Sequence, residues 1–188
     1  GSSGNATVDN GTNALIIAAS SLGGNLTLTS GHGDGIIDAA GAIVTVGGNL
    51  SATTNANNGV INMGTLAVDG TIALITNGNG NATVVNDDGL NFGTSSVGGV
   101  LTATASAGNM TDTGALIVTS TSTFTTNTDG ADIQLDTTTN RFTGAVTVNT
   151  VGTGGDAEIH GGSMPLKIIA SGEVGTLKLT TTGADITD

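Results

Sequence analysis

The sequence predicts an all-β fold, a parallel β-helix, from three observations: a repeated motif, alternating apolar residues, and turn-forming residues that bound each apolar run. The motif Gly-Gly-x-Leu followed by alternating Thr and apolar residues recurs along the chain. Its copies are Leu22–Thr29, Val46–Thr53, Val97–Thr104 and a degenerate Val174–Thr180. The second residues of these copies are separated by 24, 51 and 77 positions, close to one, two and three times a period of roughly 25 residues. The chain is therefore expected to be a repeat protein.

Short strands follow from the alternation of apolar residues between Gly, Asn and Asp, and three strands are expected in each period. The first strand should place two side chains inward in each of about seven rungs. The expected pairs are Leu26/Leu28, Leu50/Ala52, Ile72/Leu74, Leu101/Ala103, Phe124/Thr126, Val146/Val148 and Leu177/Leu179. The Phe residues are expected to be core residues because they lie at inward positions.

The second and third strands are shorter. The second is expected to end on a polar residue two positions after an apolar one, at Val8/Asn10, Ile36/Asp38, Val60/Asn62, Val84/Asn86, Met110/Asp112 and Ile186/Asp188, with Ile133 and Ile159 in less regular copies. The third is expected at Leu15/Ile17, Ile43/Thr45, Leu66/Val68, Leu90/Phe92, Leu116/Val118, Phe142 and Leu166/Ile168.

A unit of three short strands cannot close a core alone, because nothing covers the apolar face of each strand. If each period lies about 4.8 Å above the last, equivalent strands pair in parallel and the three inward faces share a triangular core. Gly, Asn and Asp at the corners tolerate left-handed backbone angles. A β-sandwich is the alternative, because its turn spacing is similar.

Composition limits the possible partners. The chain has 188 residues and a formal net charge of −12, with only three basic residues. Nucleic-acid binding is not expected because the clustered Lys and Arg that bind phosphates are missing. The sequence contains no apolar run of about 18 residues, which is the length that would indicate membrane insertion. We interpret residues 1–4 as a tag or a cut end and residues 5–188 as one β-helical repeat domain.

One stretch suggests a family. Residues Ser95–Ser120, with the sequence SSVGGVLTATASAGNMTDTGALIVTS, resemble the repeats of filamentous-haemagglutinin-like adhesins, large exoproteins of Gram-negative bacteria exported by two-partner secretion. The resemblance implies a right-handed β-helical shaft that holds an adhesive region away from the cell. It also implies a secreted or cell-surface location, with neighbouring repeats or identical chains end to end as partners. No Asn-Pro-Asn secretion motif is present, so the chain resembles shaft rather than export domain.

Catalysis is not expected. His32 and His160 should lie on equivalent corners about five rungs apart, roughly 24 Å at 4.8 Å per rung, and so cannot share a site. Asp156, Glu158 and His160 alternate on one strand, but no acidic partner for glycoside cleavage is expected on a neighbouring rung. The sequence therefore predicts no enzyme, no catalytic residue and no cofactor.

Metal binding is also not predicted. Calcium-binding β-rolls need tandem Gly-Gly-x-Gly-x-Asp repeats, which are absent here. Asp129, Asp132 and Asp136 echo part of that pattern and are the calcium candidates. The Asn and Asp residues that end the second strands are expected to bind backbone groups at a corner, because the column mixes both residue types.

Two alternatives to a shaft segment remain. The chain could be a subunit of a self-assembling extracellular fibre, because its first and last strands belong to the same expected column. It could also bind ice through a flat array of outward-facing Thr on the first strand, although Thr is equally a good residue for a solvated strand. The candidate ice-binding residues are Thr27, Thr29, Thr53, Thr102, Thr104, Thr125 and Thr147.

Overall fold

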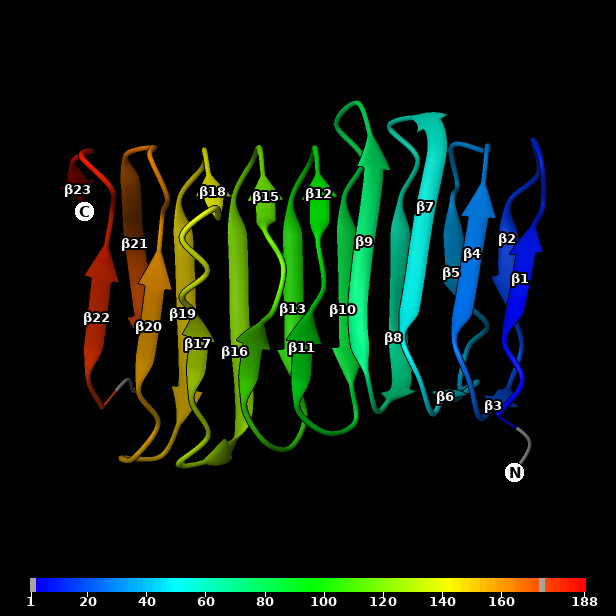
Figure 1. The fold of residues 1–188 in the computed structure, drawn as a ribbon, viewed down its shortest axis with the longest axis horizontal. Coiled ribbons are helices and arrows are strands. Elements are labelled where there is room, and N and C mark those ends of the chain that lie inside the picture. Colours follow the sequence, from blue (N-terminus) through cyan, green and yellow to red (C-terminus); the bar gives the residue numbers. More distant parts are fainter. Residues whose placement is uncertain (1–2, 173–174) are drawn as a thin grey trace.

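A computed structural model describes residues 3–172 and 175–188, and its regular elements are all strands. Residues 1–2 of the predicted tag and Val174 of the degenerate motif lie outside the described residues. Figure 1 shows one layer of strands running upward in front and a second running downward behind, while the chain advances from right to left. The coil is therefore right-handed, and its strands pair in parallel. The predicted parallel β-helix is confirmed.

Two long sheets build the coil. The path through the front sheet is β1 (Ala6–Asp9), β4 (Leu26–Ser30), β7 (Leu50–Asn57), β9 (Thr71–Asn77), β11 (Leu90–Phe92), β14 (Met110–Asp112), β17 (Ile133–Leu135), β20 (Ala157–His160) and β22 (Leu177–Thr180). The path through the back sheet is β2 (Leu15–Ile17), β5 (Ile36–Asp38), β8 (Ile61–Val68), β10 (Ala82–Asn86), β13 (Leu101–Ala105), β16 (Ser122–Asp129), β19 (Val146–Val151), β21 (Leu166–Gly172) and β23 (Ile186–Thr187).

A third strand is present in only some of the described turns. These strands are β3 (Ser20–Leu22), β6 (Val44–Val46), β12 (Ser95–Val97), β15 (Leu116–Val118) and β18 (Arg141–Phe142). The long strand β8 pairs with both β5 and β6, and β9 pairs with both β11 and β12. Three strands per turn therefore merge into two in the middle of the coil. The described residues form about eight turns, rather than the seven rungs expected.

The predicted first-strand column is wrong for the copies at Leu101, Phe124 and Val146, which lie in the back sheet, whereas Leu177 lies in the front sheet as expected. Leu50 and Ile72 lie in the front sheet, as expected, but Leu101 lies in the back sheet. The front-sheet partner of Ile72 in the next turn is Phe92, which comes well before Leu101 in the sequence. The step from Ile72 to Leu101 is therefore longer than one turn. Leu101 consequently lies on the opposite side of the coil from Ile72.

Two smaller register errors concern single positions. Ile43 was expected to face inward, but it is 57% exposed and its neighbour Val44 is buried instead. Val60 was also expected inward, whereas Ile61 and Met63 are the buried residues of β8. Adjacent β-branched residues explain both errors, because alternation alone does not say which member of the pair faces the core.

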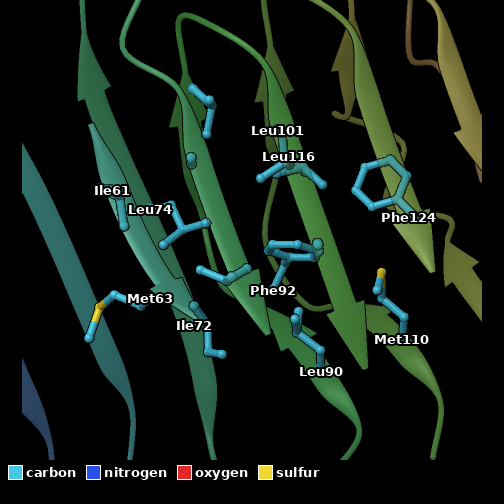
Figure 2. Packing of buried hydrophobic residues seen from close by; sticks show 14 of the residues in the cluster. Ile61, Met63, Ile72, Leu74, Leu90, Phe92, Leu101, Met110, Leu116 and Phe124 are labelled. Carbon is cyan, nitrogen blue, oxygen red and sulfur yellow. The ribbon is translucent and has the colours of Figure 1, made fainter. Parts of the chain in front are cut away.

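One apolar core runs through the coil between the sheets. Figure 2 shows Leu74 and Phe92 from the front sheet and Leu101 and Phe124 from the back sheet within it. The three rings pack edge to face, with centroids 6.1 Å apart for Phe92 and Phe124 and 5.9 Å apart for Phe124 and Phe142. The expectation that the Phe residues are core residues is confirmed. Each turn thus covers the apolar side chains of the next.

Candidate functional site

Polar side chains link successive turns at the corner that precedes the front strands. Asn5 Oδ1 accepts the backbone N–H of Asn25 at 2.8 Å, and Asn25 Oδ1 accepts that of Asn49 at 2.8 Å. Asn49 Oδ1 in turn accepts the N–H of Thr71 at 2.8 Å. These four residues form the first corner ladder. Each side chain replaces the backbone acceptor that a strand would otherwise supply, so the corner continues the hydrogen bonding of the sheet.

The corner leaves no room for a side chain on the preceding glycines. A Cβ on Gly48 would lie 2.4 Å from Asn25 Oδ1 and 2.8 Å from the carbonyl carbon of Gly24. Distances this short between a Cβ and backbone atoms do not occur without a backbone shift. The recurring Gly-Asn pair therefore has a steric explanation: the glycine of one turn packs directly on the asparagine of the previous turn.

A second corner ladder continues the arrangement further along the coil. Asn109 Oδ1 accepts the N–H of Asp132 at 2.9 Å, and Asp132 Oδ1 accepts that of Asp156 at 2.9 Å. Asp156 Oδ1 accepts the N–H of Thr176 at 2.7 Å. In both ladders the polar residue directly precedes a front strand or its first paired residue, but the second ladder is shifted along the sheet relative to the first, because Ile72 pairs with Phe92 whereas Leu90 pairs with Met110.

An open depression of about 400 Å³ lies where the two ladders are offset. Asp69 and Asp88 line it together with Asn91 and Asn109. Its wall also includes backbone at three glycines and the side chain of Thr111. The depression results from the change of register between β9 and β11, and its lining offers carboxylate and amide oxygens to solvent.

The polar residues predicted to end the second strands do bind backbone groups. Asp38 Oδ2 accepts the N–H of Thr65 at 2.7 Å. Asn86 is fully buried; its Oδ1 accepts the N–H of Val68 and its amide donates to the Val68 carbonyl. The expectation that they form one column is wrong, because Asp38 and Asn86 end back strands whereas Asp112 ends a front strand.

Asp112 is the buried carboxylate of the described chain. Its oxygens accept hydrogen bonds from the Thr137 N–H at 3.3 Å and from Asn140 Nδ2. Asn140 itself accepts the N–H of Leu116 at 2.8 Å. Burial raises the pKa of Asp112 above its ordinary value of 3.8, although the hydrogen bonds oppose this, and the negative charge of Asp136 raises it further.

The three calcium candidates lie close together in the sequence around the front strand β17, and Asp129 belongs to the back sheet. Asp129 ends β16, and Asp136 follows β17. Asp132 is part of the second corner ladder. Across residues 3–172 and 175–188, no three His, Asp or Glu side chains form a group that could hold a metal ion. Asp132 thus has an observed structural role, and the structure does not bring the three carboxylates together in one group.

The two histidines lie at separate places. His32 follows β4 and accepts the N–H of Asp34 at 3.1 Å, while His160 ends β20 and accepts the N–H of Gly162 at 2.9 Å. Glu158, between Asp156 and His160, pairs with Lys178 on β22 at 2.5 Å. Each of these side chains therefore has a local partner in its own or the next turn.

The threonines predicted to form one surface lie on two opposite sheets. Thr27, Thr29 and Thr53 are on the front sheet. Thr102, Thr104, Thr125 and Thr147 are on the back sheet. The single predicted surface is therefore wrong, for the same reason as the strand column: the motif changes sides between Ile72 and Leu101.

The back sheet nevertheless carries a regular array that sequence reasoning placed only in part. One file pairs Thr83, Thr102, Thr123 and Thr147 in register across β10, β13, β16 and β19. The adjacent file contains Thr104 and Thr125, with Val85 and Asn149 at its ends. The threonine array is defined here as Thr83, Thr102, Thr104, Thr123, Thr125 and Thr147. Thr83 and Thr123 were missed; the similar spacing of about one turn between Thr83, Thr102 and Thr123 was the available signal.

The threonine array is uncharged and rigid. All six side chains are half-buried between their neighbours, and none of the outward positions of the two files is charged. Thr has few rotamers in a strand, and parallel neighbours are about 4.8 Å apart, so the hydroxyls and methyls form a repeating pattern. The array is the most regular outward surface of the described back sheet.

Replacing Gly48 tests the corner ladder. The variant Gly48→Ala should lower the free energy of unfolding by about 1–3 kcal/mol, because its Cβ overlaps Asn25 and the backbone of Gly24. Gly64→Ala is the matched control: nothing lies within 4 Å of its Cβ, so a change within about 0.5 kcal/mol is expected. Urea unfolding measures both, and equal effects would refute the steric role of the corner.

Replacing Asp112 tests the effect of its burial on pH dependence. Because the native pKa lies above 3.8, the native state keeps its proton where the unfolded chain has lost it. Stability from this group is fully present below pH 3.8 and is lost as pH rises through the native pKa. Relative to the wild type, Asp112→Asn should therefore gain stability as pH rises through that window. A difference in unfolding free energy that stays constant with pH would contradict this.

Comparison with known proteins supports the repeat character. Residues 79–149 match a family model described as repeats of unknown function (DUF5649). The matched residues contain β10 to β18 and much of β19, and so include the whole threonine array. No curated protein and no solved structure matches the chain. The described residues contain no helix long and apolar enough to cross a membrane. The chain is a β-solenoid with repeats similar to those of that family model.

Proposed function

We propose that this chain is a structural shaft segment of a bacterial surface or secreted adhesin, which mediates display or adhesion rather than catalysis. The observation that supports this most is continuity: the apolar core passes from each turn to the next, and each of the two corner ladders links several successive turns. Because each turn contacts mainly its neighbours, length is added by adding turns, as in other solenoid architectures.

The resemblance of Ser95–Ser120 to filamentous-haemagglutinin-like repeats suggests the biological setting. This stretch lies within the segment that matches the family of repeats. In the proposed role the partners are neighbouring solenoid turns of a shaft and an adhesive region carried by it, at the cell surface or outside the cell. The formal charge of −12 does not favour contact with nucleic acid.

Removing one complete turn tests whether turns are interchangeable structural units. Deleting residues 26–49 joins Asn25 to Leu50, which keeps the Gly-Asn-Leu corner and brings β7 onto β1 and β8 onto β2 and β3. The variant should fold, with its long axis shorter by about 4.8 Å in small-angle X-ray scattering.

The matched control deletes residues 26–37, which is half as many and moves later strands to the wrong sheet. This control should lose its β-sheet circular dichroism and cooperative unfolding. If the complete-turn deletion is as damaging as the half-turn deletion, the turns are not interchangeable and the shaft proposal fails.

Ice binding is the second candidate, and the threonine array favours it. A flat surface of regularly spaced hydroxyl and methyl groups presents the kind of two-dimensional repeat that a crystal of water also has. The three aromatic rings that a carbohydrate ligand would stack against are all buried. The ice-binding residues would then be the six of the array on the back sheet, without Thr27, Thr29 and Thr53.

Ice-crystal shaping by the purified chain tests this candidate. The wild type should shape growing crystals, and Thr125→Lys should abolish the effect because it places a long charged side chain within the array. Thr27→Lys, on the opposite sheet, is the matched control and should leave shaping unchanged. Either no shaping by the wild type or equal loss in both variants would exclude the array as an ice-binding surface.

A further inference from the structure

The chain contains four Asn-Gly pairs, at residues 10–11, 58–59, 77–78 and 79–80. Asparagine is a thermolabile residue, and a following glycine makes it more so, because no Cβ hinders attack of the glycine nitrogen on the side-chain carbonyl carbon. The attack requires the glycine nitrogen to give up its proton. An N–H that donates a hydrogen bond keeps its proton more firmly and points in a fixed direction. The partners of these four N–H groups therefore decide which pair can react.

Three of the four glycine N–H groups have an acceptor. Gly11 donates to a carboxylate oxygen of Asp9 at 2.9 Å. Gly59 and Gly80 each donate to the backbone carbonyl three residues earlier, at 3.0 Å and 3.2 Å. These two glycines are also buried, which keeps a base in solution away from their nitrogens. The fold therefore protects three of the pairs.

The pair Asn77-Gly78 differs from the other three. Within the described chain the N–H of Gly78 donates no hydrogen bond, and both residues of the pair are exposed to water. Asn77 is the last residue of β9, and its amide donates to the Asn55 carbonyl of the previous turn at 2.9 Å. An ordered asparagine thus precedes a glycine nitrogen that is open to solvent.

The fold itself requires glycine at position 78. The φ of Gly78 is +62°, in the left-handed region that glycine adopts without strain. A Cβ at this position would overlap Oδ1 of Asn57 in the previous turn. The close stacking of the turns therefore creates the Asn-Gly pair, because no larger residue fits after Asn77 without a shift of the backbone.

We propose that Asn77 is the site at which this chain undergoes spontaneous deamidation. The Gly78 nitrogen loses its proton to a base in solution and forms a bond to Asn77 Cγ. The bond from Cγ to Nδ2 breaks, and Nδ2 leaves as ammonia with a proton returned from water. Water then opens the succinimide ring. Breaking the new bond to Cγ gives aspartate, and breaking the original peptide bond gives isoaspartate; water is the only co-reactant.

Either product changes the corner between the turns of β7 and β9. A carboxylate has no N–H, so the hydrogen bond from the side chain at position 77 to the Asn55 carbonyl is lost. Isoaspartate also adds one atom to the main chain, where Asn77 is the register partner of Asn57. The reaction should therefore weaken the contact between these two turns.

Incubation of the folded chain at mildly alkaline pH, followed by peptide mapping with mass spectrometry, tests the assignment. Each pair is followed by the gain in mass when the amide nitrogen is replaced by oxygen. Asn77 should convert first, several-fold faster than Asn10, Asn58 and Asn79. Faster conversion at any of these three, or equal conversion at all four, would overturn the proposal.

The same incubation in urea is the matched control. Unfolding removes the hydrogen bonds that distinguish the four glycines, so the four pairs should then convert at similar rates. A preference for Asn77 that is equally strong in the folded and the unfolded chain would mean that the fold does not select the site, and would also overturn the proposal.

Two variants test the consequence of the reaction. Asn77→Asp imitates one product. Asn79→Asp adds the same charge at an exposed residue whose backbone N–H, rather than its side chain, bonds to the previous turn. Asn77→Asp should unfold at a lower urea concentration than Asn79→Asp. Equal midpoints would overturn the proposed weakening of the contact between the turns.

Discussion

Every part of this structure depends on the covering of one turn by the next. The strands are short, and apolar side chains such as Leu50 and Leu74, on adjacent turns, are fully buried only because the turns on either side contact them. The same stacking supplies the backbone hydrogen bonds, since the register partners of each front strand belong to the turn before it and the turn after it. A single turn has no core and no sheet, so stability is a property of neighbouring turns together.

The choice of residues at the corners follows from the requirement that each turn covers the next. Stacked turns bring corner backbone close together, which leaves room for glycine and for little else, as the overlap at Gly48 shows. The asparagine or aspartate that follows the glycine supplies an acceptor where the strand has not yet begun. This division of roles explains why a sequence with few charges and many glycines and asparagines forms an ordered structure: its corner side chains accept hydrogen bonds from the backbone of the next turn.

The sequence predicted the fold class well because alternation and turn residues are local signals. The inward positions at Leu26 and Leu50 follow from the motif, and that at Ile72 follows from the alternation of apolar residues. The sheet to which a later copy belongs does not, because it depends on the length of the chain between copies, and the longer step from Ile72 to Leu101 places the next copy on the opposite side. The threonines predicted to form one surface lie on two opposite sheets for the same reason. The buried group of Asp112 and Asn140 was also out of reach, because it joins residues from different turns.

The most direct test of this account is the register where the motif changes sheets. The structure pairs Ile75 with Ser96, both outward and exposed on the front sheet, and places Thr104 on the back sheet. A single column of motif copies would instead place Ile75 beside Thr104. Oxidation of two double-cysteine variants distinguishes these arrangements. The account predicts an intramolecular disulfide in Ile75→Cys/Ser96→Cys and none in Ile75→Cys/Thr104→Cys; the opposite pattern would contradict it.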